Sequence, residues 1–386
     1  MSLGQLRQGV WLLFLVGLPL ASFPLHNNLD LWQAHAYWAQ GGILLSVVLW
    51  LWGGGKVRAN RPLAAWVAWT GFWVWLTWLR SMTAAKTFPT PLLVPLTHLL
   101  LLWLAYLATE SWTTDFLRTL MTAMAGMGVV LVAYGFLQAG NLDQFLTNFE
   151  TVTKRDVIVG TIGNPSLFST YLSLLVPLFL WKRWWIPAGA TVLLLVLLAC
   201  WYAAVAGLLA FSLVWLWWTW HEHRRTFWVS LSLSLLGGIG LLLTQHQHLT
   251  SRLLNGRWEA WSAYWPVIKE HGITGAGIGF VMALSQNIAS GPLFQWRHAH
   301  NEYLQVWLEQ GLIGLAIIGW LLLDLGRRAW RMSHTDTWLA LTGILIAFLF
   351  NSLISFPAHL WMTGSFGFLA YCGLLTLEDA HGAANA

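Results

Sequence analysis

The chain has 386 residues, of which 57% are hydrophobic and only 9% are charged, and its mean hydropathy is +0.60. A soluble domain of this length needs far more charged surface, so the composition excludes the soluble classes. Many apolar runs reach the roughly 20 residues that a transmembrane helix requires. We therefore predict an all-α fold, a polytopic membrane helical bundle formed as a single membrane domain over residues 1–386.

The first apolar run is followed by no small-residue cleavage site and no soluble body, so we expect it to be a retained span and not a signal peptide. Cys200 and Cys372 both lie in apolar runs, which indicates neither a disulfide framework nor a metal cluster. The 30 tryptophans are expected to act mainly as interfacial anchors.

Hydrophobic runs predict twelve transmembrane helices in chain order. They cover about residues 9–25, 34–53, 63–80, 89–109, 114–139, 164–181, 185–201, 203–220, 226–245, 303–325, 336–357 and 359–377. An even number of spans places both termini on one side of the membrane. We expect the short segment after Leu377 to fray.

The positive-inside rule places Met1 in the cytoplasm, because twelve of the 20 basic residues then face inward. The inward set is Arg7, Lys56, Arg58, Arg61, Arg118, Lys182, Arg183, Arg224, Arg225, Arg327, Arg328 and Arg331. The remaining eight face outward: Arg80, Lys86, Lys154, Arg155, Arg252, Arg257, Lys269 and Arg297. Basic residues outside oppose the topology signal, which suggests that they bind something anionic.

Residues 246–302 form the one long connection, an extracytoplasmic loop before the tenth span. Trp258, Trp261 and Trp265 recur at helical spacing, which is typical of an amphipathic helix in the membrane interface. Pro266 is expected to kink this helix. Gly275, Gly277 and Gly279 then alternate, which indicates close backbone packing or a tight bend.

The loop ends at His300-Asn301, directly before an apolar helix. Asn301 is a good helix N-cap, and Glu302 falls in the first turn, where the dipole favours negative charge. The same positive potential favours a neutral imidazole on His300, which makes it a candidate base. Gly311 and Gly314 are three residues apart, so we expect a neighbouring helix to pack closely against that face.

A second outer loop, 140–163, leads into Asn164-Pro165, another strong helix start. Lys154 and Arg155 precede it, so two helix N-termini near basic residues face outward, an arrangement suited to phosphate. Two His-x-His pairs form a weak metal hypothesis, because their spacing lacks the usual ligand geometry. They comprise His246, His248, His298 and His300.

Three landmarks resemble the bacterial O-antigen ligase and O-antigen polymerase superfamily. The first is His300-Asn301, nine residues, then Gly311-x-x-Gly314. The second is Gly256-Arg257-x-x-x-Trp261 followed by Gly275-x-Gly277-x-Gly279, and the third is Gly163-Asn164-Pro165 opening a span. The landmarks also occur in the family's order. With the twelve predicted spans and the large loop before the tenth, the similarity covers most of the chain.

The resemblance implies an integral-membrane glycosyltransferase of the inner membrane, with its active site on the extracytoplasmic face. Its donor would be a polyprenyl-diphosphate-linked glycan and its acceptor a glycolipid or glycan. By the same resemblance His300 is the base, Arg257 binds the donor diphosphate, and Arg80 or Lys86 supplies a further cation. Asn301, His298 and Asn164 are expected to support the site.

One departure from the family concerns a Ser-Arg pair between spans seven and eight, whose arginine also contacts diphosphate. The corresponding stretch, 200–205, has no arginine. Arg155, Arg297 or Arg80 is expected to replace it. Of these, Arg155 lies nearest to a helix N-terminus, and the charge of Arg297 would also lower the proton affinity of His300.

The chemistry of the residues is compatible with this function. A diphosphate leaves without protonation if cations stabilise its charge, whereas a hydroxyl needs a general base. Direct displacement inverts the anomeric centre and requires no cofactor and no metal. The acceptor remains open between lipid A core, a second lipid-linked glycan and a protein hydroxyl. A transporter or flippase for an anionic lipid-linked solute is the alternative from another class.

Overall fold

The computed structural model describes residues 2–21, 31–55, 60–84, 106–107, 109–143, 158–198, 212, 216, 228, 257–287, 298–332 and 335–384. Within these ranges the chain is helical and has no strand. Three helical stretches are long and apolar enough to cross a bilayer: Leu3–Leu20, Thr114–Ala139 and Glu302–Arg331. An all-α membrane protein is therefore confirmed. The number of twelve spans stays a prediction, because 203–220, 226–245 and most of 89–109 lie outside the described residues.

The chain divides into two compact units. Unit 1 contains Met1–Gly42, Ser111–Leu253 and Arg331–Ala386, and unit 2 contains Ile43–Glu110 and Leu254–Trp330. The chain passes from unit 1 into unit 2 within the helix α2 (Leu31–Trp52). It returns to unit 1 within the short 3₁₀ helix η2 (Thr109–Ser111). Each unit has its own packing and is described by itself.

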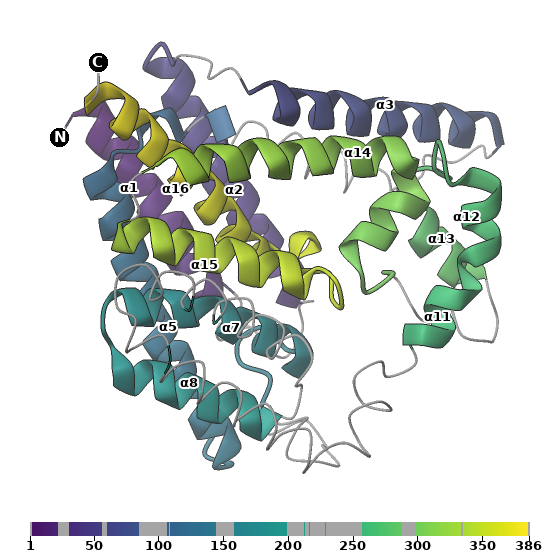
Figure 1. Cartoon of the computed structure of the whole chain (residues 1–386). Coiled ribbons are helices and arrows are strands. Elements are labelled where there is room, and N and C mark those ends of the chain that lie inside the picture. Colours follow the sequence, from purple (N-terminus) through teal and green to yellow (C-terminus); the bar gives the residue numbers. More distant parts are fainter. Residues whose placement is uncertain are drawn as a thin grey trace. The chain divides into compact units, whose positions relative to one another are not determined.

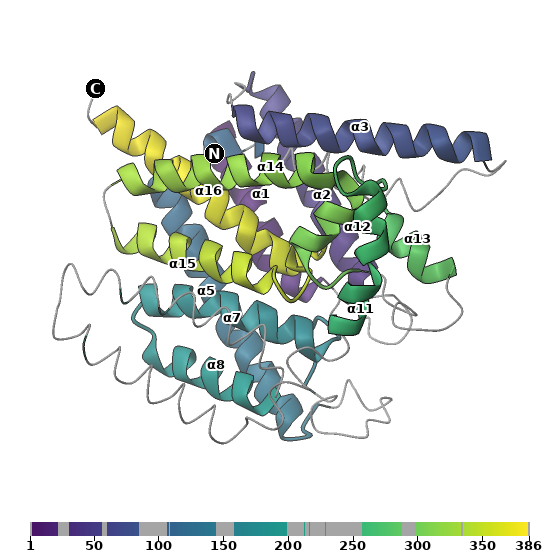
Figure 2. The same ribbon diagram turned by 45° about the vertical axis from the view of Figure 1, so that its right-hand side comes forward.

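Unit 1 is a bundle of helices (Figure 1). Its helices are α1 (Leu3–Gly17), α5 (Thr114–Ala139), α7 (Pro165–Trp181), α8 (Trp185–Leu198), α15 (Asp336–Asn351) and α16 (Trp361–Ala384), with the 3₁₀ helices η1 (Leu18–Leu20) and η3 (Pro357–His359). The helix α15 packs against both α7 and α16 (Figures 1 and 2). In α5, a side chain at Gly128 would collide with Leu175 and Phe179 of α7, so glycine permits this close approach.

The ends of unit 1 differ from the sequence prediction. The first helix begins at Leu3, because Ser2 and Gln5 form a reciprocal capping box. The last helix continues to Ala384, so the expected fraying after Leu377 is wrong. The end of the predicted span at 357 is also wrong, because α15 stops at Asn351 and a 3₁₀ turn follows.

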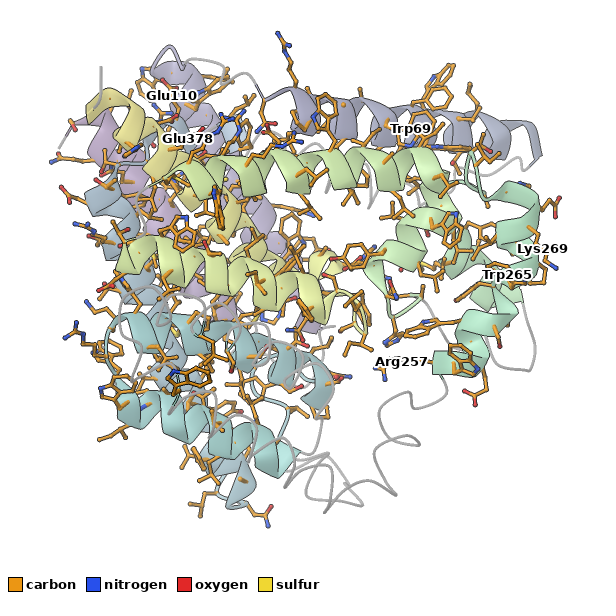
Figure 3. All side chains as sticks on the ribbon, viewed as in Figure 1. Trp69, Glu110, Arg257, Trp265, Lys269 and Glu378 are labelled. Carbon is orange, nitrogen blue, oxygen red and sulfur yellow. The ribbon has the colours of Figure 1, made fainter. Side chains whose placement is uncertain are left out.

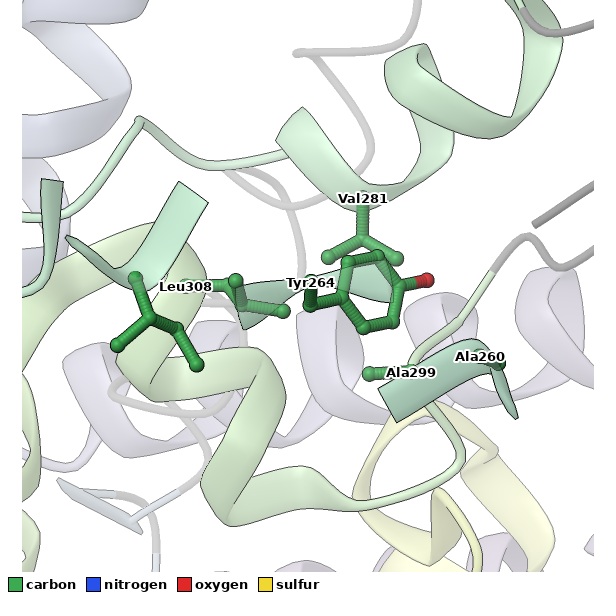
Figure 4. Packing of buried hydrophobic residues seen from close by; sticks show 6 residues of the cluster. Ala260, Tyr264, Val281, Ala299 and Leu308 are labelled. Carbon is green, nitrogen blue, oxygen red and sulfur yellow. The ribbon is translucent and has the colours of Figure 1, made fainter. Parts of the chain in front are cut away.

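Unit 2 contains α3 (Arg61–Ala84), α11 (Arg257–Ala263), α12 (Trp265–His271), α13 (Phe280–Asn287) and α14 (Glu302–Arg331). Its core joins α11, α12, α13 and the first part of α14 around Tyr264, which is fully buried (Figure 4). Val281, Ala299 and Leu308 surround the tyrosine ring. A smaller apolar cluster joins Trp73 and Val74 of α3 to Ile278.

The helix α14 is interrupted at Gly311, which has φ 71° and ψ −172°. A helix interrupted at such a point leaves the preceding carbonyl groups without their usual partners. The prediction that Gly311 and Gly314 share one face for a neighbouring helix is therefore wrong. A side chain at Gly311 would collide with the backbone of Ile273 and Thr274, and one at Gly314 would meet Gln310 and Val306 of its own helix.

Candidate functional site

The break in α14 is closed by the segment 272–277, which lies before α13. Ala276 donates its N–H to the Leu308 carbonyl at 2.8 Å, and Gly277 donates to the Glu309 carbonyl at 3.0 Å. In return the Gly272 carbonyl accepts from the N–H of Leu312 at 3.0 Å. These bonds replace the lost helical ones, so irregular backbone is tolerated in an apolar helix.

Two tryptophans complete the closure of this break. The indole of Trp307 donates to the Gly272 carbonyl at 3.0 Å, and that of Trp69 in α3 donates to the Gln310 carbonyl at 3.2 Å. Thr70 adds a longer bond, 3.3 Å, to the Gln310 side chain. The sequence analysis expected the tryptophans to act mainly as interfacial anchors. It did not predict that their indole N–H groups would donate hydrogen bonds to backbone carbonyls.

Two of the alternating glycines, Gly275 and Gly277, pack closely against neighbouring helices, as predicted. Gly275, Gly277 and Gly279 have φ values of 90°, 110° and 81°, a region that L side chains rarely adopt. A Cβ atom at Gly275 would lie 2.5 Å from the Glu309 carbonyl oxygen, and one at Gly277 would lie 3.0 Å from Thr77 Oγ1. The glycine run therefore lets the loop backbone reach both α14 and α3.

The tryptophan-rich segment forms two short helices with distinct faces. Arg257, Ala260 and Tyr264 are buried on one side, whereas Trp258 and Trp265 are exposed by 64% and 53%. The segment is amphipathic, as predicted, and it breaks where α12 begins with Pro266 in its first turn. In Figure 3 the side chain of Arg257 and that of Lys269 lie on opposite sides of the segment.

His300 and Asn301 begin α14 as expected. The Asn301 side chain accepts a hydrogen bond from the N–H of Leu304 at 2.9 Å, and the Asn301 backbone carbonyl accepts one from the N–H of Gln305 at 2.9 Å. His300 has φ 52°, one of three positive values among non-glycine residues in the described ranges. Such a conformation costs about 1–2 kcal/mol for an L residue and persists only where the surroundings impose it.

Burial and, to a smaller extent, the positive charge of Arg257 together lower the pKa of His300 to about 4. These two causes support the predicted neutral imidazole. Arg257 is 4% exposed, so its charge acts through a medium that screens weakly. Both residues belong to unit 2, where the charge of Arg257 acts on the imidazole of His300.

Two residues bind the backbone of Ala299, which is fully buried between the two histidines, and a third extends this set. The sequence analysis named Trp261 only as part of a motif and did not select Gln305 or Glu309. Trp261 donates its indole N–H to the Ala299 carbonyl at 2.8 Å, and the Ala299 N–H is donated to Gln305 Oε1 at 3.1 Å. Gln305 Nε2 reaches Glu309 Oε1 at 3.5 Å. The sequence held a signal for Gln305 and Glu309: together with Glu302 they form a polar i, i+3, i+7 stripe along α14.

The other predicted site residues fall into two groups. His298 is half-buried beside Ala299, Arg80 lies in α3, and Asn164 caps α7 through bonds to the N–H groups of Ser166 and Leu167 at 2.9 and 3.1 Å. Arg155, Arg297, Lys86, Lys154, His246 and His248 lie outside the described residues. Their roles, including the replacement of the family arginine, stay predictions.

Unit 1 has a surface hollow of about 450 Å³ where the first turns of α5 approach the end of α7. Arg118 and Lys182 line it with Trp181, and none of the predicted site residues does. Within the described ranges, no group of three or more His, Cys, Asp or Glu residues is placed to hold a metal ion. The proposed four-histidine cluster is untested, because two members lie outside these ranges.

A comparison with protein families places a match on the part of the chain that holds this site. The family model described as O-antigen ligase matches residues 190–319, which include Arg257, the glycine run, His300 and the break at Gly311. No curated protein sequence matches the chain. The family match confirms that the chain resembles the O-antigen ligase and O-antigen polymerase superfamily, as its motifs predicted.

Proposed function

We propose that this protein transfers a glycan from a polyprenyl-diphosphate donor to an acceptor hydroxyl at the extracytoplasmic face of the bacterial inner membrane. The observation that carries the proposal is a neutral imidazole, His300, held beside a buried cation, Arg257. An acceptor hydroxyl needs a base that is unprotonated at neutral pH, and a diphosphate needs fixed positive charge. The family match supports the glycosyltransferase class.

The transfer is a single displacement. The acceptor oxygen attacks the anomeric carbon while the bond from that carbon to the diphosphate oxygen breaks. His300 takes the hydroxyl proton, and the polyprenyl diphosphate leaves with its added charge balanced by Arg257. One displacement without a covalent enzyme intermediate inverts the anomeric configuration. Arginine supplies charge stabilisation in this scheme, so it requires no metal ion.

Three acceptors fit the scheme, and the proposal ranks them as lipid A core, a second lipid-linked glycan and a protein hydroxyl. The match to an O-antigen ligase family favours the first. A flippase is the rival from another class, since transporters bind solutes at interrupted helices. In α14 the carbonyl groups at the break already accept from Ala276, Gly277 and Trp69, which argues against an ion or solute held there.

The direct test uses purified protein in detergent with a lipid-linked glycan and lipid A core. The wild type is expected to release polyprenyl diphosphate and form an inverted product. His300→Asn is expected to lose about 10²–10⁴-fold in rate, because asparagine tolerates the left-handed backbone but is no base. Comparable rates for the two proteins would remove His300 from the mechanism. After reconstitution into liposomes, translocation of the lipid-linked glycan without bond cleavage would favour the flippase.

A chelation experiment tests the metal-independent part of the scheme. Activity is expected to survive exhaustive treatment with EDTA, since Arg257 and His300 carry the charge and the proton. Loss of activity that one divalent ion restores would contradict this scheme. It would also favour the histidine cluster that includes His246 and His248 as a metal site.

A further inference from the structure

We propose that Gln305 is a positioning residue of the transfer step, because it fixes the backbone that orients His300. The proposal rests on the function proposed above, in which His300 is the base. Gln305 is 6% exposed and lies one turn after Asn301 on the inward stripe of α14. Its side chain accepts the N–H of Ala299 at 3.1 Å.

The two peptide groups of Ala299 are held by side chains from two different helices of unit 2. The side chain of Gln305 in α14 accepts a hydrogen bond from the Ala299 N–H, and the indole of Trp261 in α11 donates one to the Ala299 carbonyl at 2.8 Å. That carbonyl belongs to the peptide that joins Ala299 to His300, so its direction sets one side of the φ rotation of His300. On the other side Asn301 is held by the start of α14.

These constraints explain how a histidine keeps φ 52°. Without them the residue relaxes towards the right-handed or extended regions, and its imidazole moves away from Arg257. A shift of about 1 Å in a reacting group can cost on the order of 10²-fold in rate. Packing alone would not require an amide at position 305, because the buried Leu308 and the partly buried Leu304 beside it are apolar.

Glu309 determines which end of the Gln305 amide faces Ala299. Its Oε1 lies 3.5 Å from Gln305 Nε2 and 3.4 Å from the N–H of Val281, and both distances are long for hydrogen bonds. The carboxylate attracts the NH₂ end and repels the oxygen, so the amide oxygen is directed towards the Ala299 N–H. The pair Gln305 and Glu309 therefore acts as one hydrogen-bonded unit.

A charge-conserving exchange tests this unit. Gln305→Glu alone places two carboxylates together and is expected to lower kcat by about 10–10²-fold with donor KM unchanged. The double variant Gln305→Glu and Glu309→Gln restores every bond: residue 305 still accepts from Ala299, and residue 309 donates to 305 and accepts from Val281. Its kcat is expected to return to within about threefold of wild type.

A double variant that stays as impaired as Gln305→Glu, while it keeps the wild-type melting temperature and elution volume in detergent, would overturn the proposal. Unchanged kcat in Gln305→Glu and in Gln305→Ala would overturn it as well. A fall in melting temperature without a fall in kcat per folded molecule would mean that Gln305 acts only in stability.

Two tryptophans provide a matched pair in the same unit. Trp261→Phe and Trp307→Phe each remove one indole N–H that is donated to a backbone carbonyl, of Ala299 and Gly272 respectively. The first is expected to lower kcat, and the second to change it by less than about threefold. Equal effects would assign the loss to general destabilisation and would contradict a special role for Ala299.

A readout without glycan separates failure of this proposal from failure of the proposed function. Diethyl pyrocarbonate modifies neutral imidazole, and mass spectrometry follows the rate at His300 with the half-exposed His271 as internal reference. Gln305→Ala is expected to raise the rate at His300 severalfold relative to His271, and the double exchange to restore it. If Gln305→Ala leaves the modification rate of His300 unchanged, the positioning role is overturned. If the modification rates change as expected but the wild-type protein transfers no glycan, only the proposed function is overturned.

Discussion

The helices α7 and α14 begin in the same way but in different surroundings. Each has an asparagine N-cap, Asn164 or Asn301, whose side chain accepts free backbone N–H groups. Each cap follows a residue in the left-handed region, with φ 78° at Gly163 and φ 52° at His300. Glycine takes this conformation without strain, whereas histidine takes it at a cost.

A buried glutamine holds the loop before each of these helices. Gln138 of α5 accepts the N–H groups of Val159 and Gly160 at 3.0 and 2.8 Å, and Gln305 accepts that of Ala299. The first clamp leads to the capped helix α7. The second leads to an imidazole near a buried arginine, so the comparison indicates that strain is retained where it positions chemistry.

Reciprocal substitutions at the two left-handed positions test this reading with the largest expected effect. His300→Gly relieves the strain, so the melting temperature is expected to stay level or rise while the transfer rate falls by about 10²–10⁴-fold. Gly163→Ala introduces the strain and is expected to cost about 1–2 kcal/mol of stability. Thermal unfolding in detergent and a transfer assay measure both, and a destabilised but active His300→Gly protein would contradict the comparison.

The charge next to the imidazole is tested by Arg257. Arg257→Ala removes the proposed charge-assisted contact to the donor diphosphate and is expected to reduce the donor-dependent transfer rate by about 10–10²-fold. Arg257→Lys is expected to have an intermediate rate, because lysine cannot form the paired contacts of a guanidinium. Lys269→Ala is the matched control, since it removes an exposed cation from α12. If all three variants kept the wild-type rate and donor dependence, Arg257 would not belong to the site.

The closure of the break in α14 is tested by two glycines of the same run. Gly275→Ala adds both backbone strain and a collision with the Glu309 carbonyl, and it is expected to destabilise by more than about 2 kcal/mol. Gly279→Ala adds the strain alone, because no described atom lies within 4 Å of its Cβ position. Melting temperatures should follow this order. A reversed order would mean that the loop does not pack into the break.

The smallest expected effect concerns pH. A base with a pKa of about 4 is neutral through the physiological range, so the transfer rate is expected to hold down to about pH 5 and then fall as His300 takes up a proton. Arg257→Ala removes one of the two causes that depress the pKa, so the acid limb moves to higher pH but stays below 6.5. Lys269→Ala should leave the limb in place. An unshifted limb in Arg257→Ala would show that its charge does not act on the base.

Local sequence was sufficient for several parts of the fold and site. Asn164, Asn301 and the alternating glycines were recognised because caps and positive φ values depend on a few neighbouring residues. The choice of Arg257 followed from the family resemblance, and its burial became visible only in the structure. The twelve spans were derived from hydropathy, and three of them remain beyond the described residues, so that number is still a prediction.

The sequence by itself determined the membrane class and the helix caps at Asn164 and Asn301, because composition and capping are local properties. The pairing of His300 as a candidate base with Arg257 as a candidate anion ligand came from the family resemblance. Only the tertiary structure decided that α14 is interrupted at Gly311, that segment 272–277 supplies the missing hydrogen bonds, and that Trp261 and Gln305 hold Ala299. These contacts join residues far apart in the sequence: Trp307 and Gly272 are separated by 35 positions, and Trp261 and Ala299 by 38. The bond from Trp69 to Gln310 spans 241 positions. Hydrogen-bond partners at such separations are set by how the helices pack, and periodicity within one helix carries no record of them.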